Sequence, residues 1–368
     1  MKVLVTGAEG FIAKNLIVIL KKMPQIEILK YTQKESLLVL ENLVQNSDFI
    51  FHLAGVNRPK DKNEFYKGNS GFTQILISLL RKYDKSVPIL FSSSSQVGNG
   101  SDYAKSKEEA EKILQDYALM HNSSLFIYRL ENVFGKWSKP NYNSVIATWC
   151  YNITRDIDIE INSKSIELNL VYIGDVIHSF INHLYLNNTQ DIFYQVKRVY
   201  KKSLGEIENL LFKFKASRQN LLIPNIAKGF ERVLYATYLS YLPKDKFSYI
   251  LEGHSDSRGT FYEILKTMDS GQLGISTTKP GITRGNHYHN TKNEKFLVIK
   301  GQAIIELRDV FSEEIIEYKV DGNKLEIVEM IPGYTHNIKN SGDEEMVLLI
   351  WANENYDPKA PDTNFLEV

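Results

Sequence analysis

The chain has 368 residues, and its 44 lysines and arginines balance its 44 aspartates and glutamates, so the formal net charge is zero. This balance argues against a nucleic-acid partner and against binding to a charged membrane surface, both of which select basic chains. The single cysteine, Cys150, excludes an intrachain disulfide, and no apolar run approaches the length of a membrane span. We therefore expect a soluble, cytoplasmic protein.

Short apolar segments alternate with amphipathic segments in the first half of the chain. This alternation predicts an α/β fold, a Rossmann-like doubly wound parallel sheet with helices on both faces. We expect strands at residues 2–6, 26–31, 49–53, 89–92 and 125–129, with helices between them that include 11–21 and 102–121.

The first expected strand runs into a glycine-rich turn and then into an apolar helix. Gly7 and Gly10 bracket the turn, and Phe11 and Ile12 open the helix. Glycines let the backbone turn tightly and approach a pyrophosphate, to which a helix N-terminus offers its N–H groups. The turn therefore predicts a dinucleotide site, with an ordinary strand-to-helix turn as the alternative.

Several motifs in chain order resemble the extended short-chain dehydrogenase/reductase family. They are the glycine turn Gly7-x-x-Gly10-x-x-Ala13, the segment His52-Leu53-Ala54-Gly55, the serines at 92–95 and the pair Tyr103-x-x-x-Lys107. The resemblance implies that Leu53, Ala54 and Gly55 contact the cofactor. It also implies that Ser94 is catalytic, with the neighbouring serines as alternatives.

Tyr103 and Lys107 lie four residues apart and thus on one helix face. A nearby ammonium lowers the pKa of a phenol from about 10, so Tyr103 is expected to protonate a substrate carbonyl oxygen. A nicotinamide would deliver hydride to the carbon. The resemblance implies that Lys107 also holds the nicotinamide ribose and that Ser94 bonds the same carbonyl oxygen. A solvated helical pair is the alternative.

The end of the second expected strand bears on the choice of dinucleotide. NAD selectivity usually needs an acidic side chain at this strand tip, where the chain instead has Thr32, Gln33 and Lys34. The first two can bond a 2′-phosphate and Lys34 can pair with it. The sequence therefore favours NADP(H) over NAD(H), and Glu35 is the residue that argues against this choice.

A further segment, residues 129–135, resembles the R-x-x-N-V-Y-G of family members that act on nucleotide sugars. The resemblance implies that Asn132 contacts the diphosphate or the sugar. This chain departs from the family at Val97, where an aromatic residue is usual. The departure leaves the pose of the sugar open.

From residue 251 onward the sequence pattern changes to short apolar segments that are interrupted by Gly, Pro and Asn. This pattern predicts short strands and an all-β sandwich or barrel. We place the boundary within 242–248 and expect a reductase domain with a substrate subdomain at 1–245 and a cupin domain at 246–368. The apolar stretch 233–241 is either a helix of the first domain or a contact between domains. Strands are expected at 296–299, 303–307, 315–320 and 346–351.

The spacing of His287, His289 and Glu294 matches the first cupin motif, and His336 belongs to the second, in which Ile331 replaces a proline. His287 and His289 alternate along a strand and therefore face the same side. Three imidazoles and a carboxylate fit one Zn²⁺ per cupin domain, with Fe or Mn as alternatives. A metal-free cupin with buried histidines remains possible.

Segments 256–263 and 284–288 resemble cupin-fold nucleotide-keto-sugar epimerases. The resemblance implies that Arg258 and Arg284 bind the substrate diphosphate, for which guanidinium forks are well suited. It also makes His287 a general base. A histidine nitrogen bound to a metal cannot abstract a proton, so ligand and base are rival roles for His287, and the complete cupin spacing favours the ligand.

The two modules together, over essentially the full length, resemble CapF-type bifunctional enzymes of bacterial capsular polysaccharide synthesis. This resemblance implies a homodimer that epimerises a UDP-4-keto-6-deoxy-N-acetylhexosamine at C3. NADPH reduction at C4 would then give a UDP-6-deoxy-L-talose derivative. Two alternatives remain: a cupin that serves only as a metal-stabilised dimerisation or binding module, or a dinucleotide sensor joined to a cupin oxygenase.

Overall fold

The computed structural model describes residues 1–185 and 191–368 and divides into two compact units. The first comprises Met1–Phe212 and Ala227–Pro243, and the second comprises Lys213–Ile226 and Lys244–Val368. The main division thus falls after Pro243, beside the expected boundary at residue 245. The inclusion of Lys213–Ile226 in the second unit was not expected from the sequence.

A six-stranded parallel sheet forms the centre of the first unit, in the order β2-β1-β3-β4-β5-β8. The strand order reverses between β1 and β3, and ligands of doubly wound sheets bind beyond the carboxyl ends of the strands at such a point. The strands are β1 Lys2–Thr6, β2 Glu27–Tyr31, β3 Phe49–His52, β4 Ile89–Ser94, β5 Leu125–Leu130 and β8 Phe193–Tyr194.

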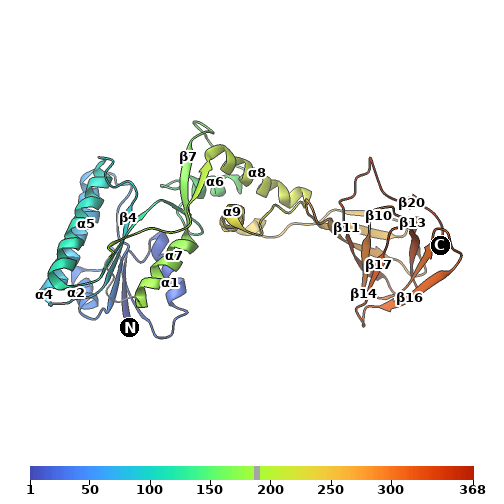
Figure 1. Ribbon diagram of the computed structural model, residues 1–368, viewed down its shortest axis with the longest axis horizontal. Coiled ribbons are helices and arrows are strands. Elements are labelled where there is room, and N and C mark those ends of the chain that lie inside the picture. Colours follow the sequence, from blue (N-terminus) through green and yellow to red (C-terminus); the bar gives the residue numbers. More distant parts are fainter. Residues whose placement is uncertain (186–190) are drawn as a thin grey trace. The chain divides into compact units, whose positions relative to one another are not determined.

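Helices cover both faces of this sheet (Figure 1). Successive residues of β1 show why, because Val3 and Val5 join one apolar cluster whereas Leu4 joins another on the opposite face. The predicted doubly wound α/β fold is confirmed. The α-helices of the chain are α1 Phe11–Leu20, α2 Leu37–Gln45, α3 Asn63–Tyr66, α4 Phe72–Lys82, α5 Asp102–His121, α6 Val145–Ile153, α7 Ile173–Asn182, α8 Leu204–Asn220 and α9 Gly229–Leu239.

Helix α5 is bounded by local signals. The Ser101 hydroxyl caps its start by accepting a hydrogen bond from the Ala104 N–H at 3.2 Å. Asn122 ends it in the left-handed conformation, at φ 49°. The helix therefore begins one residue before Tyr103 and places Lys107 one turn further along the same face.

Smaller elements complete the first unit. A three-stranded sheet has the order β6-β7-β9, and a π-helical segment leads from α3 into α4. The stretch expected as either a helix or a domain contact forms α9, within the first unit. The elements are β6 Asn132–Phe134, β7 Glu167–Tyr172, β9 Tyr200–Ser203, the π-helix η1 Lys67–Gly71 and the 3-10 helix η2 His183–Tyr185; a second 3-10 helix, η3 Lys244–Lys246, begins the second unit's main stretch.

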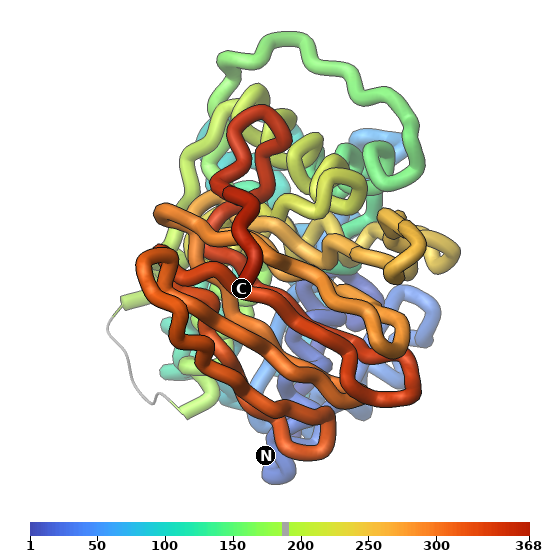
Figure 2. Tube along the Cα trace, turned by 90° about the vertical axis from the view of Figure 1, so that its right-hand side faces the viewer, coloured from blue at the N-terminus to red at the C-terminus, as the bar shows by residue number. Residues whose placement is uncertain are grey.

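Two antiparallel sheets build the second unit, in the orders β10-β11-β12-β19-β14-β17 and β16-β15-β18-β13-β20. Residues of both sheets share one apolar core, for example Val298 and Leu348 from the first and Ile305 and Ile338 from the second. Figure 2 traces these strands in orange and red. The predicted all-β part is confirmed, and its strands are β10 Gly253–Asp256, β11 Gly259–Lys266, β12 Gln272–Thr278, β13 Thr283–Tyr288, β14 Glu294–Lys300, β15 Gln302–Asp309, β16 Ile315–Asp321, β17 Ile327–Met330, β18 Tyr334–Asn340, β19 Met346–Ala352 and β20 Asn364–Phe365.

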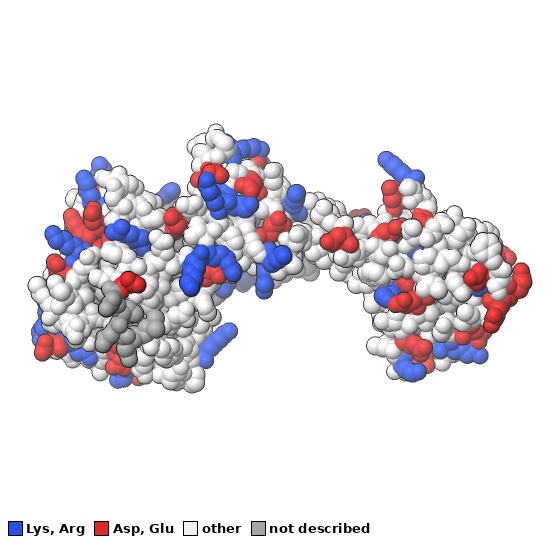
Figure 3. Space-filling model, viewed as in Figure 1, with Lys and Arg blue, Asp and Glu red and all other residues white. Residues whose placement is uncertain are grey.

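The surface agrees with the balanced composition. Basic and acidic side chains are interspersed over the face of the molecule shown in Figure 3. Among the described residues, no helix combines the length and the apolar character needed to cross a lipid bilayer.

Candidate functional sites

The glycine turn lies where the strand order of the sheet reverses. Gly7 has φ +66°, and a Cβ atom there would lie 2.8 Å from the Ala54 Cα and 2.9 Å from the Ala54 N. The Thr6 hydroxyl accepts hydrogen bonds from the N–H groups of Leu53 and Ala54, each at 3.2 Å. Turn and segment are therefore held together without side chains between them, as a bound pyrophosphate requires. The residues present fit a dinucleotide.

A cavity of about 1610 Å³ joins this turn to the expected catalytic residues. Its volume exceeds that of most small-ligand pockets and leaves room for a dinucleotide beside a second ligand. Among the predicted site residues, its walls include Gly10, Phe11, Ile12, Leu53, Gly55, Ser94, Tyr103, Lys107 and Asn132.

Thr32 and Lys34 lie beside the glycine turn, since the Ala8 N–H bonds the Tyr31 carbonyl at 3.1 Å. Their polar groups already have acidic partners. The Thr32 N–H and hydroxyl donate to the Glu35 carboxylate at 2.6 and 2.5 Å, and the Lys34 ammonium lies 2.7 Å from Glu9. Glu35 thus uses the donors of Thr32 that a 2′-phosphate would need. Gln33 is exposed between them, and the preference for NADP(H) stays a prediction.

The expected lowering of the Tyr103 pKa by Lys107 is wrong for this arrangement of side chains. Burial raises the pKa of Tyr103, and an interaction with Ser94 opposes that rise. Lys107 instead donates to the Ser92 carbonyl at 3.0 Å and lies over the Phe91 ring. Burial also lowers the pKa of Lys107 to about 8. Ser94 lies near enough to Tyr103 to lower its pKa, and both residues line the cavity; the catalytic role of Ser94 stays a prediction.

Glu111 lies on the helix that carries Tyr103 and Lys107, and it was not predicted from the sequence. Its buried carboxylate accepts hydrogen bonds from the Ser93 hydroxyl at 2.5 Å and from Arg129 Nη2 at 2.7 Å. Its charge also raises the pKa of Lys107, one helical turn away, against the larger effect of burial. The four-residue spacing of Lys107 and Glu111 on one helix is the signal that could have revealed it.

Two further buried polar residues, Asn69 and His52, lie close to residues of the cavity wall and were not among the predicted site residues. The Asn69 amide accepts from the Val56 N–H at 2.9 Å and donates to the Ser106 hydroxyl at 2.9 Å, and it sits in the π-helix η1. His52 bonds Thr6 on one side, and its burial lowers its pKa to about 3, so the ring is neutral. No sequence spacing points to Asn69, and the motif that contains His52 implied a cofactor contact only for its last three residues.

Asn132, the predicted substrate contact, lies on β6 at the cavity wall. Its side-chain N–H donates to the Asn169 carbonyl on β7 at 3.0 Å. This bond fixes the amide at the edge of the small sheet. Its role toward a substrate stays a prediction.

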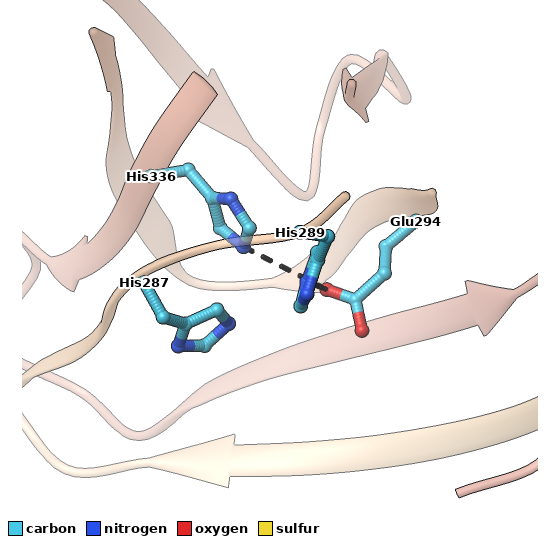
Figure 4. Close-up of side chains that lie close together, drawn as sticks. All are labelled: His287, His289, Glu294 and His336. Atoms are coloured by element: carbon cyan, nitrogen blue, oxygen red, sulfur yellow. Dashed lines mark ion pairs between the residues drawn. The ribbon is translucent and has the colours of Figure 1, made fainter. Parts of the chain in front are cut away.

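The four predicted metal ligands converge inside the second unit (Figure 4). One candidate ligand atom from each of His287, His289, Glu294 and His336 lies within 4.8 Å of all the others. The fold explains this, because His287 pairs with His336 across β13 and β18, while Glu294 begins β14. His289 and His336 are each only 1% exposed.

The electrostatics of this cluster favour a cation. The Nε2 atoms of His289 and His336 lie 3.6 and 3.7 Å from the Glu294 carboxylate, and neither has a hydrogen-bond partner among the described residues. Burial, with the two neighbouring histidines, lowers the pKa of His287 to about 4, so its ring is neutral. Unpartnered buried nitrogens and a carboxylate are the donors that divalent zinc binds. The residues present therefore fit a metal ion.

The two predicted diphosphate-binding arginines gather around Asp256. Arg258 bonds its carboxylate at 2.6 Å, and Arg284 Nη2 lies 3.6 Å from it. The Arg284 Nε and Nη2 atoms are buried and lack hydrogen-bond partners among the described residues, and burial lowers the pKa of this guanidinium. Arg284 thus pairs with Asp256 by charge, while its Nε and Nη2 atoms have no hydrogen-bond partner among the described residues.

Comparison with known proteins gives the family of this chain. Residues 3–191 match the NAD dependent epimerase/dehydratase family, and residues 254–364 match the polysaccharide biosynthesis C-terminal domain. The crystal structure of the capsular polysaccharide assembling protein CapF from Staphylococcus aureus superposes with a TM-score of 0.94, at 45% identity and with 100% of both chains covered. The chain is a CapF-like member of the NAD dependent epimerase/dehydratase family.

Two further proteins are similar to this chain, one over its full length and one over its first part. The UDP-2-acetamido-2,6-beta-L-arabino-hexul-4-ose reductase of Pseudomonas aeruginosa is 47% identical over 99% of this chain and 98% of its own length. The UDP-glucuronic acid 4-epimerase of Bacillus cereus covers 66% of this chain and 96% of its own, with a TM-score of 0.56 at 20% identity. The second likeness shows the fold of the dinucleotide-binding part alone.

Proposed function

We propose that this chain carries out two consecutive reactions on a UDP-linked 4-keto sugar during capsular polysaccharide precursor synthesis. The second unit epimerises a UDP-4-keto-6-deoxy-N-acetylhexosamine at C3, and the first unit reduces the C4 ketone to a UDP-6-deoxy-L-talose derivative. The reductase named above for Pseudomonas aeruginosa acts, by its name, on a 4-ulose of this kind. The observation that carries the proposal is the presence, in one chain, of a Ser94–Tyr103 site and a buried cluster of metal-ligand residues.

In the first unit, Tyr103 gives its phenolic proton to the C4 oxygen while Ser94 donates a hydrogen bond to the same oxygen. Lys107 would hold the ribose next to the nicotinamide, and the glycine turn would hold the pyrophosphate. Thr32, Gln33 and Lys34 are the residues that would hold the 2′-phosphate of NADPH, which when bound would supply the hydride. Burial of Tyr103 keeps the phenol protonated and thus ready to donate.

In the second unit, His287, His289, Glu294 and His336 would hold one Zn²⁺, with Fe or Mn as alternatives. Such an ion, when bound, polarises a ketone and acidifies the neighbouring C–H. Arg284, with Arg258, binds the diphosphate, and the Arg284 donors that have no hydrogen-bond partner among the described residues support this assignment. His287 is assigned as a ligand, because its ring belongs to the cluster and is neutral.

The order of the two reactions follows from carbonyl chemistry. A carbon next to a ketone loses its proton readily, whereas the same carbon next to an alcohol does not. Epimerisation must therefore precede reduction, and reduction traps the new configuration. We also propose that the protein acts as a cytoplasmic homodimer.

The test is time-resolved NMR of the UDP-4-keto sugar with the enzyme in deuterated buffer, with and without NADPH. Without NADPH, deuterium should enter at C3 and the ketone should persist. With NADPH, the ketone should disappear and the 6-deoxy-talose product should accumulate. If no deuterium enters the ring, the second unit is not an epimerase and serves instead as a metal-stabilised binding or dimerisation module.

A further inference from the structure

The last strand of the second unit lies against the segments that carry the clustered histidines. β20 pairs with β13, where Phe365 faces His287 and Asn364 faces Tyr288. The Leu366 carbonyl accepts a hydrogen bond from the hydroxyl of Thr335, the residue before His336. Residues 364–366 therefore contact the chain beside two of the four candidate ligands.

Asp362, just before this strand, fixes the link between the other two candidate ligands. Its carboxylate accepts hydrogen bonds from the N–H groups of Asn290, Thr291 and Lys292 at 3.0, 2.7 and 3.0 Å. It also accepts from the side chains of Asn290 and Thr291, at 2.9 and 3.1 Å. These three residues connect His289 to the segment that leads into Glu294, so one carboxylate holds the whole turn.

The backbone of Asp362 also contacts His289, one of the candidate ligands, directly. Its carbonyl oxygen accepts a hydrogen bond from His289 Nδ1. A carbonyl cannot donate, so Nδ1 is the donor of this hydrogen bond and Nε2 is the nitrogen left to bind a metal. That Nε2 atom is buried, has no hydrogen-bond partner among the described residues and lies 3.6 Å from the Glu294 carboxylate.

We infer that Asp362 is a positioning residue of the metal centre: its side-chain carboxylate holds the turn between His289 and Glu294 in register, and this keeps the backbone carbonyl of the same residue at Nδ1 of His289. The inference rests on the proposed metal centre. Partners that orient a histidine ligand in this way typically contribute 10- to 100-fold to metal affinity. Asp362 lies far along the chain from both cupin motifs.

The experiment measures Zn²⁺ affinity by chelator competition on the full chain, with Asp362→Ala, Asp362→Asn and a control, Asp357→Ala. Asp357 is exposed and accepts a hydrogen bond from the Lys359 N–H at 2.9 Å. We expect Asp362→Ala to bind Zn²⁺ about 10- to 100-fold more weakly, Asp362→Asn to lose less, and the control to match wild type. The Co²⁺ absorption spectrum of Asp362→Ala should shift, because the ligand geometry changes.

The outcomes separate this inference from the proposed centre. If wild type binds no Zn²⁺, or if His336→Ala binds it as wild type does, the metal centre itself is wrong. If wild type binds and folded Asp362→Ala has the same affinity and the same Co²⁺ spectrum, the centre stands and the positioning role is overturned. A lower melting temperature with unchanged affinity also overturns it. Should Asp362→Ala fail to fold, Asp362→Asn decides by the same criteria.

Discussion

The two units of the chain assemble their reactive groups in different ways. In the first unit, Tyr103 and Lys107 come from consecutive turns of one helix, and Lys107 and its neighbour Glu111 are both satisfied by protein partners. In the second unit, the candidate ligands come from segments that are distant in the chain, and the buried Nε2 atoms of His289 and His336 have no hydrogen-bond partner among the described residues. In the first unit, Lys107 and Glu111 are satisfied as soon as the protein has folded. In the second unit, the unpartnered nitrogens would gain a partner only when an ion binds.

The largest expected effect isolates the first unit. Tyr103→Phe removes the phenolic proton donor, so keto-sugar reduction should slow by about 10²- to 10⁴-fold. Deuterium exchange at C3, which belongs to the second unit, should continue at the wild-type rate. NADPH oxidation and NMR of the same samples measure both. Reduction that continues at an undiminished rate would show that another group supplies the proton.

The next effect isolates the second unit. His336→Ala removes a buried ligand, so Zn²⁺ affinity should fall by on the order of 100-fold or more, and exchange at C3 should stop. Reduction of a ketone that is already epimerised should be unchanged. His254→Ala, an exposed histidine on β10, is the matched control. The comparison between the units fails if His336→Ala also abolishes reduction.

Acid should destabilise the first unit independently of Zn²⁺. Burial lowers the pKa of His183 to about 4 in the first unit. Its stabilising contribution is fully present above about pH 6.5 and is lost as the pH falls through 4, because the unfolded chain then binds the extra proton. The free energy of unfolding should drop by on the order of 2 kcal/mol over this range, with or without Zn²⁺.

Urea unfolding across pH 4–7 measures this slope. His183→Asn should flatten it, whereas His178→Asn should not, because His178 is exposed on α7. A slope for the first unit that depends on added Zn²⁺ would contradict the independence of the two sites.

The smallest expected effect concerns dinucleotide selectivity. Lys34→Ala removes an exposed cation, so the KM for NADPH should rise about two- to five-fold and the KM for NADH should not change. Glu35→Ala frees the Thr32 donors and should lower the KM for NADPH. Steady-state kinetics with both dinucleotides measure these shifts. An equal change for both dinucleotides would place the 2′-phosphate elsewhere.

Features set by neighbouring residues were predictable from the sequence. The strand Lys2–Thr6 and the helix Asp102–His121 lie where the alternation of apolar and amphipathic segments placed them. The ligand cluster was also predictable, although its members are distant, because a motif spacing encodes the pairing of β13 with β18.

Features set by tertiary contacts were not predictable. The raised pKa of Tyr103 depends on burial by residues far from the Tyr-x-x-x-Lys motif. The bond between Glu111 and Arg129 joins side chains on α5 and β5, and the bonds of Asp362 span 70 or more residues. No local pattern records such partners, because each is chosen by the way the sheets and helices come together.

The position of the segment Lys213–Ile226 limits where the gene for such a chain can be cut and recombined. Because this segment belongs to the second unit, the backbone passes from one unit to the other at three places. Within the second unit, Leu222 bridges Lys266 on β11, and Arg218 bonds the Lys246 carbonyl at 2.6 Å. A gene cut once near residue 245 would separate Lys213–Ile226 from the rest of the second unit. Recombination that exchanges the second unit intact therefore needs three junctions. Two lie in α8 and its following loop, and one lies after Pro243.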